Sequence, residues 1–142
     1  MCADFRQLEE FKRKLQELER SQIDEFMDSC CKELAARLLA KVIRRTPVDS
    51  GYLRRGWTAG RNQNAKAYVN SLSVTNHGST YEITISNPVE YCPYVEYGHR
   101  TRGSGWVDGK FMLTISSDEI KASSQEILTK KLRKFMKEVF DS

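Results

Sequence analysis

Apolar residues recur every three or four positions in the first third of the chain, a spacing typical of amphipathic helices. In residues 5–18 charged positions separate the apolar ones, which predicts a first helix with one apolar face. A wider apolar stripe runs from Ile23 to Ile43, so a second helix is expected to be mostly buried. Ser21 offers an N-terminal cap for this second helix. Pro47 predicts its end, because the residue before a proline resists helical geometry.

Alternating apolar positions predict a small antiparallel sheet in the middle of the chain. In residues 68–74 the apolar positions fall on one face of a first strand, and in residues 81–85 they fall on one face of a second strand. Residues 76–79 suit the hairpin loop that would join these two strands. Over residues 89–97 we expect a short strand or an extended edge segment, because Pro93 cannot donate a hydrogen bond within a central strand.

Glycine-rich sequence separates this sheet from the last part of the chain. Residues 98–109 contain four glycines, which argues against regular structure, so a mobile loop is expected over residues 99–110. From Phe111 onward the apolar residues return to helical spacing, and basic residues near the end suit the helix dipole. The order helix, sheet, helix predicts an α+β fold, with N-terminal helices and a long C-terminal helix packed on a small antiparallel β-sheet.

Length and charge set limits on this picture. With 142 residues the chain fits a single domain, in which residues 1–21 form a helical extension to a core of residues 22–142. Residues 46–66 carry 4 basic side chains and 1 acidic one, whereas residues 67–98 carry 3 acidic side chains and no basic one. This distribution is weak support for a dedicated DNA-binding domain, and it suits a subunit whose oppositely charged surfaces meet its neighbours.

No pattern in the sequence predicts catalysis. The chain has no glycine-rich phosphate-binding motif and no Cys-x-x-Cys pair, and we expect its four cysteines to be reduced. Cys92 and His99 could in principle form a nucleophile–base pair, but Pro93 and their short separation favour ordinary packing. No segment is long and apolar enough to span a bilayer. We therefore predict no enzyme, no cofactor, no metal, no membrane and no small-molecule substrate.

Two short stretches, residues 54–57 and residues 100–106, each combine two arginines with a tryptophan. One reading is nucleic-acid contact by charge and stacking, which would make the chain a small nucleic-acid-binding module that uses basic loops 54–66 and 99–110. The other reading is a tryptophan anchored in the core or at a subunit interface, where tryptophan and arginine are enriched. We favour the interface. The assembly-interface candidates are Arg54, Arg55, Trp57, Glu96, His99, Arg100, Arg102 and Trp106.

Three stretches together resemble the sequence pattern of a known family. Residues 46–54 read TPVDSGYLR and resemble the signature TPVDTGxLR, while residues 91–98 read YCPYVEYG and resemble YAxYVEFG. Residues 109–113 resemble a glycine-then-apolar entry into the last helix. This is the pattern of neck, or head–tail joining, proteins of long-tailed bacteriophages, often labelled minor tail components, and it covers about residues 22–140. The motif residues are Pro47, Asp49, Gly51, Leu53, Tyr94, Glu96 and Gly98.

The resemblance implies a non-catalytic structural protein of a virion or prophage, in the neck or tail-completion region. It implies a ring of copies at the head–tail junction, through which DNA passes without being a binding partner. The expected partners are copies of the chain itself and other phage neck, connector or tail proteins. The expected location is the virion, at the head–tail junction or tail, and the bacterial host cytoplasm during assembly.

Overall fold

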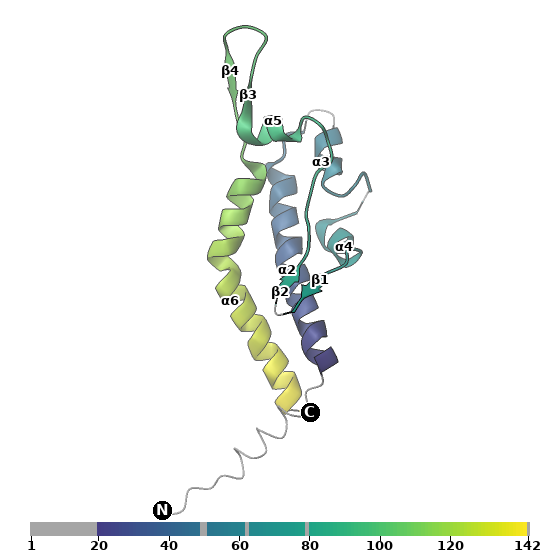
Figure 1. Cartoon of the computed structure of the whole chain (residues 1–142). Helices are drawn as coiled ribbons and strands as arrows, with labels where there is room; N and C mark the ends of the chain where they lie inside the picture. The colour runs from purple at the N-terminus through teal and green to yellow at the C-terminus, as the bar shows by residue number, and fades with distance from the viewer. Residues whose placement is uncertain (1–19, 49–50, 62, 79, 142) are drawn as a thin grey trace, which may run out of the picture.

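The computed structural model describes residues 20–48, 51–61, 63–78 and 80–141. Two long helices, α2 (Arg20–Arg45) and α6 (Met112–Phe140), run side by side in opposite directions and form the body of the molecule (Figure 1). The helix expected over residues 5–18 lies outside what the structure describes. The prediction that Ser21 caps the second helix is wrong, because Ser21 lies within α2. None of the described helices combines the length and the apolar content that crossing a membrane requires.

Short elements fill the connection between the two long helices. The helices α3 (Tyr52–Gly56) and α4 (Ala65–Asn70) lie on one side of α2, and α5 (Cys92–Tyr97) crosses near the start of α6 (Figure 1). The strands β1 (Thr75–His77) and β2 (Thr80–Glu82) form one antiparallel pair, and β3 (Gly98–Arg100) and β4 (Trp106–Asp108) form another. The α+β class is confirmed, and the molecule is mostly helical.

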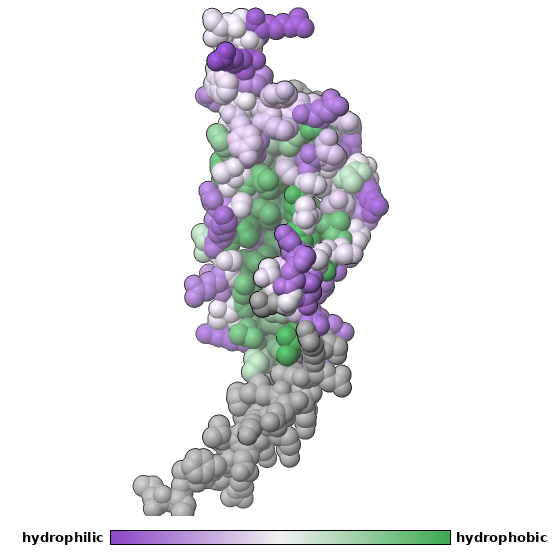
Figure 2. Space-filling view, in the orientation of Figure 1, coloured by the Kyte–Doolittle hydropathy of each residue, from purple (hydrophilic) through white to green (hydrophobic). Residues whose placement is uncertain are grey.

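The hydrophobic core lies between α2 and the short elements, and it reaches α6 at one end. From α2 it takes Ala35, Leu39 and Val42, which recur at helical spacing on one face. The remaining buried members are Leu53, Trp57, Val69, Val89, Cys92 and Met112. Strongly hydrophobic residues also gather along the two long helices, whereas few of them cover the β3–β4 hairpin (Figure 2).

Several boundaries predicted from the sequence are confirmed. The helix α2 ends at Arg45, two residues before Pro47. The strands β1 and β2 pair as a hairpin in which Thr75 faces Glu82 and His77 faces Thr80. The loop is shorter than the predicted residues 76–79, because β1 extends to His77. Pairing stops at Glu82, so the return strand is shorter than the predicted residues 81–85. The long C-terminal helix is present as α6, which begins at Met112.

The first predicted strand, over residues 68–74, is wrong, because β1 begins only at Thr75. Residues 65–70 form the helix α4 instead, and the side chain of Asn64 caps this helix by accepting a hydrogen bond from the backbone nitrogen of Ala67 at 2.8 Å. Tyr68 and Leu72 are four residues apart, and that spacing suits a helix as well as a strand. The asparagine cap therefore decides between the two structures.

Residues 92–97 and 98–108 also differ from their predictions. The expected edge segment over residues 89–97 contains the helix α5, because Pro93 lies in its first turn, where a missing N–H group costs nothing. The expected loop at residues 99–110 contains the β3–β4 hairpin, so the argument that four glycines exclude regular structure is wrong. Gly103 and Gly105 lie in the hairpin turn, and Gly98 and Gly109 lie at its base.

Candidate assembly surface

The β3–β4 hairpin projects from the end of the molecule where α5 meets α6 (Figure 1). Gly98 takes a φ of 91°, a left-handed conformation that side chains with a Cβ rarely adopt. A Cβ on Gly109 would collide with the carbonyl oxygen of Glu96. These two glycines let the strands leave the helices closely spaced, with Gly98 paired to Asp108.

Glu96 ties α5 to the start of α6. Its side chain is 6% exposed, and its carboxylate accepts hydrogen bonds from the backbone nitrogens of Leu113 at 2.9 Å and Thr114 at 3.0 Å. The Thr114 hydroxyl donates a third bond at 2.7 Å. A carboxylate at a helix N-terminus satisfies free N–H groups and interacts favourably with the helix dipole. Glu96 therefore has hydrogen-bond partners within its own chain.

Backbone hydrogen bonds strengthen the same junction. The nitrogens of Lys110 and Phe111 donate to the carbonyl oxygens of Val95 at 2.8 Å and Glu96 at 3.0 Å. Phe111 has a φ of 47°, a left-handed conformation that costs about 1–3 kcal/mol for a residue with a side chain. The surrounding hydrogen bonds hold it there, so the base of the hairpin is fixed to the long helices.

Aromatic side chains cluster on the outside of this junction. We call the following group, whose members are 40% to 65% exposed, the aromatic surface: Tyr52, Tyr91, Tyr94, Tyr97, Trp106 and Phe111. The rings of Tyr52 and Tyr91 lie 6.3 Å apart between centroids, and those of Tyr97 and Phe111 lie 6.4 Å apart. Exposed apolar patches of this kind mark interaction sites more often than isolated apolar residues do.

Three basic candidates belong to the hairpin beside this surface. Arg100 and Arg102 are exposed. His99 is half-buried, and its ring lies edge-on to Tyr94 with 6.1 Å between centroids. The Nδ1 atom of His99 is buried and has no hydrogen-bond partner among the described residues. The structure thus brings His99, Arg100, Arg102 and Trp106 together on one projection.

The other arginine–tryptophan stretch is arranged differently. Trp57 is 2% exposed, and its indole nitrogen donates to the hydroxyl of Thr46 at 2.9 Å. The Thr46 hydroxyl itself donates to the carbonyl oxygen of Val42 at 2.7 Å, so it links α2 to the segment that follows. Arg54 is half-buried and donates to the Thr46 carbonyl oxygen at 3.0 Å. Trp57 belongs to the core, and of these candidates Arg55 alone remains exposed.

The first sequence motif has a structural role that this geometry explains. Gly51 has a φ of 77° and starts α3, and its carbonyl oxygen accepts from the nitrogen of Arg55 at 2.9 Å. Leu53 is buried, and its carbonyl oxygen accepts from the side-chain amide of Asn87 at 2.8 Å. Pro47 is exposed just after α2. Asp49 lies outside the described residues.

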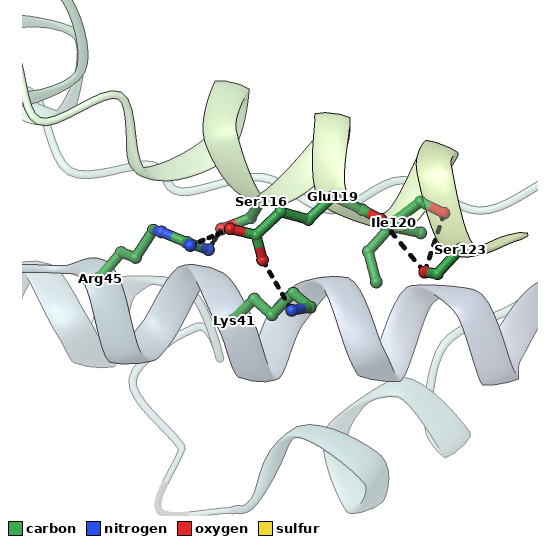
Figure 3. Close-up of polar contacts among 6 residues, drawn as sticks. All are labelled: Lys41, Arg45, Ser116, Glu119, Ile120 and Ser123. Carbon is green, nitrogen blue, oxygen red and sulfur yellow. Dashed lines mark hydrogen bonds and ion pairs between the residues drawn. The ribbon is translucent and has the colours of Figure 1, made fainter.

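A polar cluster joins the two long helices near the same end. Glu119 of α6 accepts from Lys41 of α2 at 2.7 Å and also pairs with Arg45, which donates to the hydroxyl of Ser116 at 3.1 Å (Figure 3). Hydrogen bonds from Lys41 and Arg45 lower the pKa of Glu119 from its ordinary value. The cluster fixes the register between α2 and α6.

The described residues offer little for catalysis. Burial raises the pKa of the Cys92 thiol, and the same cause raises the pKa values of Cys30 and Cys31, which opposes formation of a reactive thiolate. In the described ranges no group of three or more His, Cys, Asp or Glu side chains is placed to hold a metal ion. What this end of the molecule presents is contact area: aromatic rings at a fixed junction, and arginines on the hairpin beside it.

Four members of the aromatic surface were not among the sequence candidates: Tyr52, Tyr91, Tyr97 and Phe111. The sequence did carry a signal for two of them, because Tyr91, Tyr94 and Tyr97 are spaced by three, and residues three apart are neighbours on a helix surface. In the extended segment predicted for residues 89–97 this spacing has no meaning, since a strand would place alternate residues on opposite faces.

The chain was compared with known protein families, curated proteins and solved structures. A family model described as "Bacteriophage HK97-gp10, putative tail-component" matches residues 9–98, which is more than half of the chain. The match ends at Gly98, where β3 begins, so most of the hairpin and all of α6 lie beyond it. No curated protein and no solved structure matches the chain.

Proposed function

Because the chain belongs to the HK97-gp10-like family of bacteriophage tail components, we propose that it is a structural part of the phage neck or tail-completion region. In this proposal copies of the chain assemble in a ring that helps to join head to tail, and the chain has no catalytic role. Its partners are its own copies and other phage neck, connector or tail proteins. It resides in the virion, and in the bacterial host cytoplasm during assembly.

The aromatic surface is the observation that carries this proposal. Tyrosine, tryptophan and arginine dominate the binding energy of protein interfaces, and all three are exposed at the hairpin end. The rings of Tyr94, Tyr97 and Phe111 lie on a junction fixed by Glu96, so these rings lose little conformational freedom when they bind. A ring requires two different surfaces on each copy, one meeting the other. The basic hairpin supplies one of them, and the exposed Glu82 on β2, which lies beside α2 away from the hairpin, suits the other (Figure 1).

The rival function as a nucleic-acid-binding module through loops 54–66 and 99–110 has less support. Stacking on bases needs an accessible ring, and Trp57 is buried with its indole nitrogen bonded to Thr46. Loop 54–66 therefore retains only exposed charges such as Arg55 and Arg61. Loop 99–110 retains Trp106, but this ring belongs to the aromatic surface.

The test replaces three rings of the aromatic surface, in the variant Tyr94→Ser/Tyr97→Ser/Trp106→Ser. Joining of phage heads to tails is measured in an extract that lacks the wild-type chain. The expected result is loss of joining with an unchanged thermal unfolding midpoint. The matched control is Ile23→Ser/Leu132→Ser, which removes exposed apolar side chains from the far part of the two long helices. Normal joining by the ring variant, or equal loss in both variants, would contradict the proposal.

A further inference from the structure

A second surface lies between the two long helices, away from the aromatic surface. A groove of about 690 Å³ is lined by residues of α2 and α6. On α2 its lining residues lie opposite the core residues Ala35, Leu39 and Val42, because at about 3.6 residues per turn Arg37 and Arg44 fall on the other side of the helix. The cations in the groove are Arg37, Lys41 and Arg44 from α2, and Lys130, Lys131 and Lys134 from α6.

The charges in this groove are only partly balanced. Its lining holds two carboxylates, and each pairs within its own helix: Glu33 with Arg37 at 3.0 Å and Glu126 with Lys130 at 3.2 Å. Exposed pairs of this kind contribute little to stability. Among the described residues, an ion pair between the two walls occurs only at Glu119, where Lys41 and Arg45 meet α6 (Figure 3).

Three cations are left with no carboxylate in salt-bridge range in the described part of the chain: Arg44, Lys131 and Lys134. Arg44 lies at the end of the groove where Lys41 and Arg45 meet Glu119, whereas Lys131 and Lys134 lie at the other end, further along α6. Unpaired positive charge is therefore present at both ends of the groove, and it attracts an anion that lies along the groove. The groove is thus built to receive negative charge.

The shape of the groove favours a polymer over a small anion. Its lining on α6 extends from Ile120 to Lys134, which at 1.5 Å per residue corresponds to about 20 Å. Over that length double-stranded DNA presents about twelve phosphate charges. No aromatic residue lines the groove, so it offers no platform on which the bases of a single strand could stack. Lysine and arginine on both walls suit the regular charges of a duplex backbone.

We propose that the α2–α6 groove binds the sugar–phosphate backbone of double-stranded DNA without sequence preference. The site is separate from the basic loops 54–66 and 99–110. In this proposal the chain contacts DNA directly, whereas the resemblance implies only that DNA passes through the ring. The proposal rests on the proposed function only for the source of the DNA, which would be the genome crossing the head–tail junction.

The test compares two variants that each remove three positive charges. The groove variant is Arg44→Gln/Lys131→Gln/Lys134→Gln, and the matched control is Arg100→Gln/Arg102→Gln/Lys110→Gln on the hairpin. Binding of each full chain to a short labelled duplex is measured by fluorescence anisotropy over a salt series, with two unrelated DNA sequences. Each lost phosphate contact makes the slope of log K against log salt shallower by about 0.9, so the groove variant should lose about 2.7 and the control almost nothing.

Several results would overturn the site. The first is that the wild-type chain does not bind the duplex at low salt. The others are that both variants lose the same amount of slope, or that the hairpin variant loses more. If polyglutamate displaces the labelled duplex at a lower concentration of charges than unlabelled duplex does, the ligand would be an acidic protein segment instead. If Lys131→Gln disturbs folding, the exposed Lys134→Gln alone should still shift the slope by about 0.9. Duplex binding is scored without heads or tails, so failure of the assembly proposal would be recognised separately.

Discussion

Two stretches of this chain look alike in sequence and lie in opposite environments. Each has two arginines and a tryptophan within a few residues, yet Trp57 is 2% exposed and Trp106 is 57% exposed. Trp57 follows α3, which packs on α2, and it finds a hydroxyl partner in Thr46. Trp106 lies on a two-stranded hairpin, which has no second layer to bury its rings. Composition alone therefore cannot distinguish an anchor in the core from one at an interface.

The largest expected effect is at the buried tryptophan. Trp57→Ala should lower the free energy of unfolding by about 3–5 kcal/mol, because it removes a large core side chain and leaves a cavity. Trp106→Ala, measured alongside, should stay within about 0.5 kcal/mol of the wild type. Urea unfolding followed by fluorescence and by circular dichroism gives both values. Similar losses in the two variants would end the distinction between the stretches.

The hydroxyl of Thr46 accounts for part of that difference. Thr46→Val keeps the shape of the side chain but leaves the indole N–H group of Trp57 buried without an acceptor, at a cost of about 1–3 kcal/mol. Thr46→Ser keeps the acceptor and should be milder. In a double-mutant cycle with Trp57→Phe, the Thr46→Val change should cost clearly less than it does alone. Strict additivity would mean that the hydrogen bond contributes nothing.

Local signals in the sequence were sufficient for part of this fold and insufficient for the rest. Pro47 marked the end of α2, and helical spacing after Phe111 marked α6, because neither depends on distant residues. The nature of residues 65–70 depended on whether Asn64 caps a helix, and both outcomes fitted the spacing of Tyr68 and Leu72. The position of Trp57 depended on Thr46, whose contribution appears only when α2 and α3 are packed together.

The candidate assembly surface also contains some residues that the sequence predicts and some that it does not. Arg100, Arg102 and Trp106 were identified from composition, and they do lie together on the hairpin. An exposed edge segment over residues 89–97 predicts that Glu96 contacts a neighbouring copy. Its actual partners are the N–H groups at the start of α6, seventeen and eighteen residues further along the chain. A contact at that separation leaves no periodic signal in the sequence.

Glu96 joins α5, beside the exposed hairpin of Trp106, to the start of α6 in the body of the molecule. Replacing it therefore tests the comparison between the exposed and the buried stretch. Glu96→Ala should cost about 1–2 kcal/mol, because two backbone N–H groups at the start of α6 lose their acceptor. Hydrogen exchange at Leu113 and Thr114 should increase, while exchange in the core around Leu39 changes much less. Glu96→Gln retains one acceptor oxygen and should fall between the wild type and Glu96→Ala. Unchanged exchange at α6 would contradict this role.

Glu119 provides a smaller, pH-dependent effect in the body of the molecule. Hydrogen bonds from Lys41 and Arg45 lower the pKa of Glu119 in the folded chain. A lowered folded-state pKa gives stability that is present above the unfolded value, about 4.3, and is lost as the pH falls through the folded value. Glu119→Gln should therefore reduce the unfolding midpoint slightly at neutral pH and not at strongly acidic pH. A constant difference across a pH series of thermal melts would contradict the ion pairs as its source.

The smallest effect on stability is expected at the hairpin itself. Replacing residues 100–107 with a neutral Gly/Ser linker removes Arg100, Arg102 and Trp106, all of them exposed. The free energy of unfolding should stay within about 0.5 kcal/mol of the wild type, because these side chains pack little on the body and the base at Gly98 and Gly109 is kept.

Joining of heads to tails should nevertheless be abolished in this linker variant, since the hairpin rings and charges are gone. We predict that the hairpin is mobile in the free chain and becomes ordered on assembly, which costs about 1–2 kcal/mol of backbone entropy for each residue fixed and needs contacts from a partner. Amide relaxation measured on the free chain tests the mobility directly. A linker variant that joins heads to tails normally would show that the hairpin is dispensable. One that unfolds would show that the exposed Trp106 stretch stabilises the fold as the buried Trp57 stretch does, and the difference between the two stretches would then be one of exposure alone.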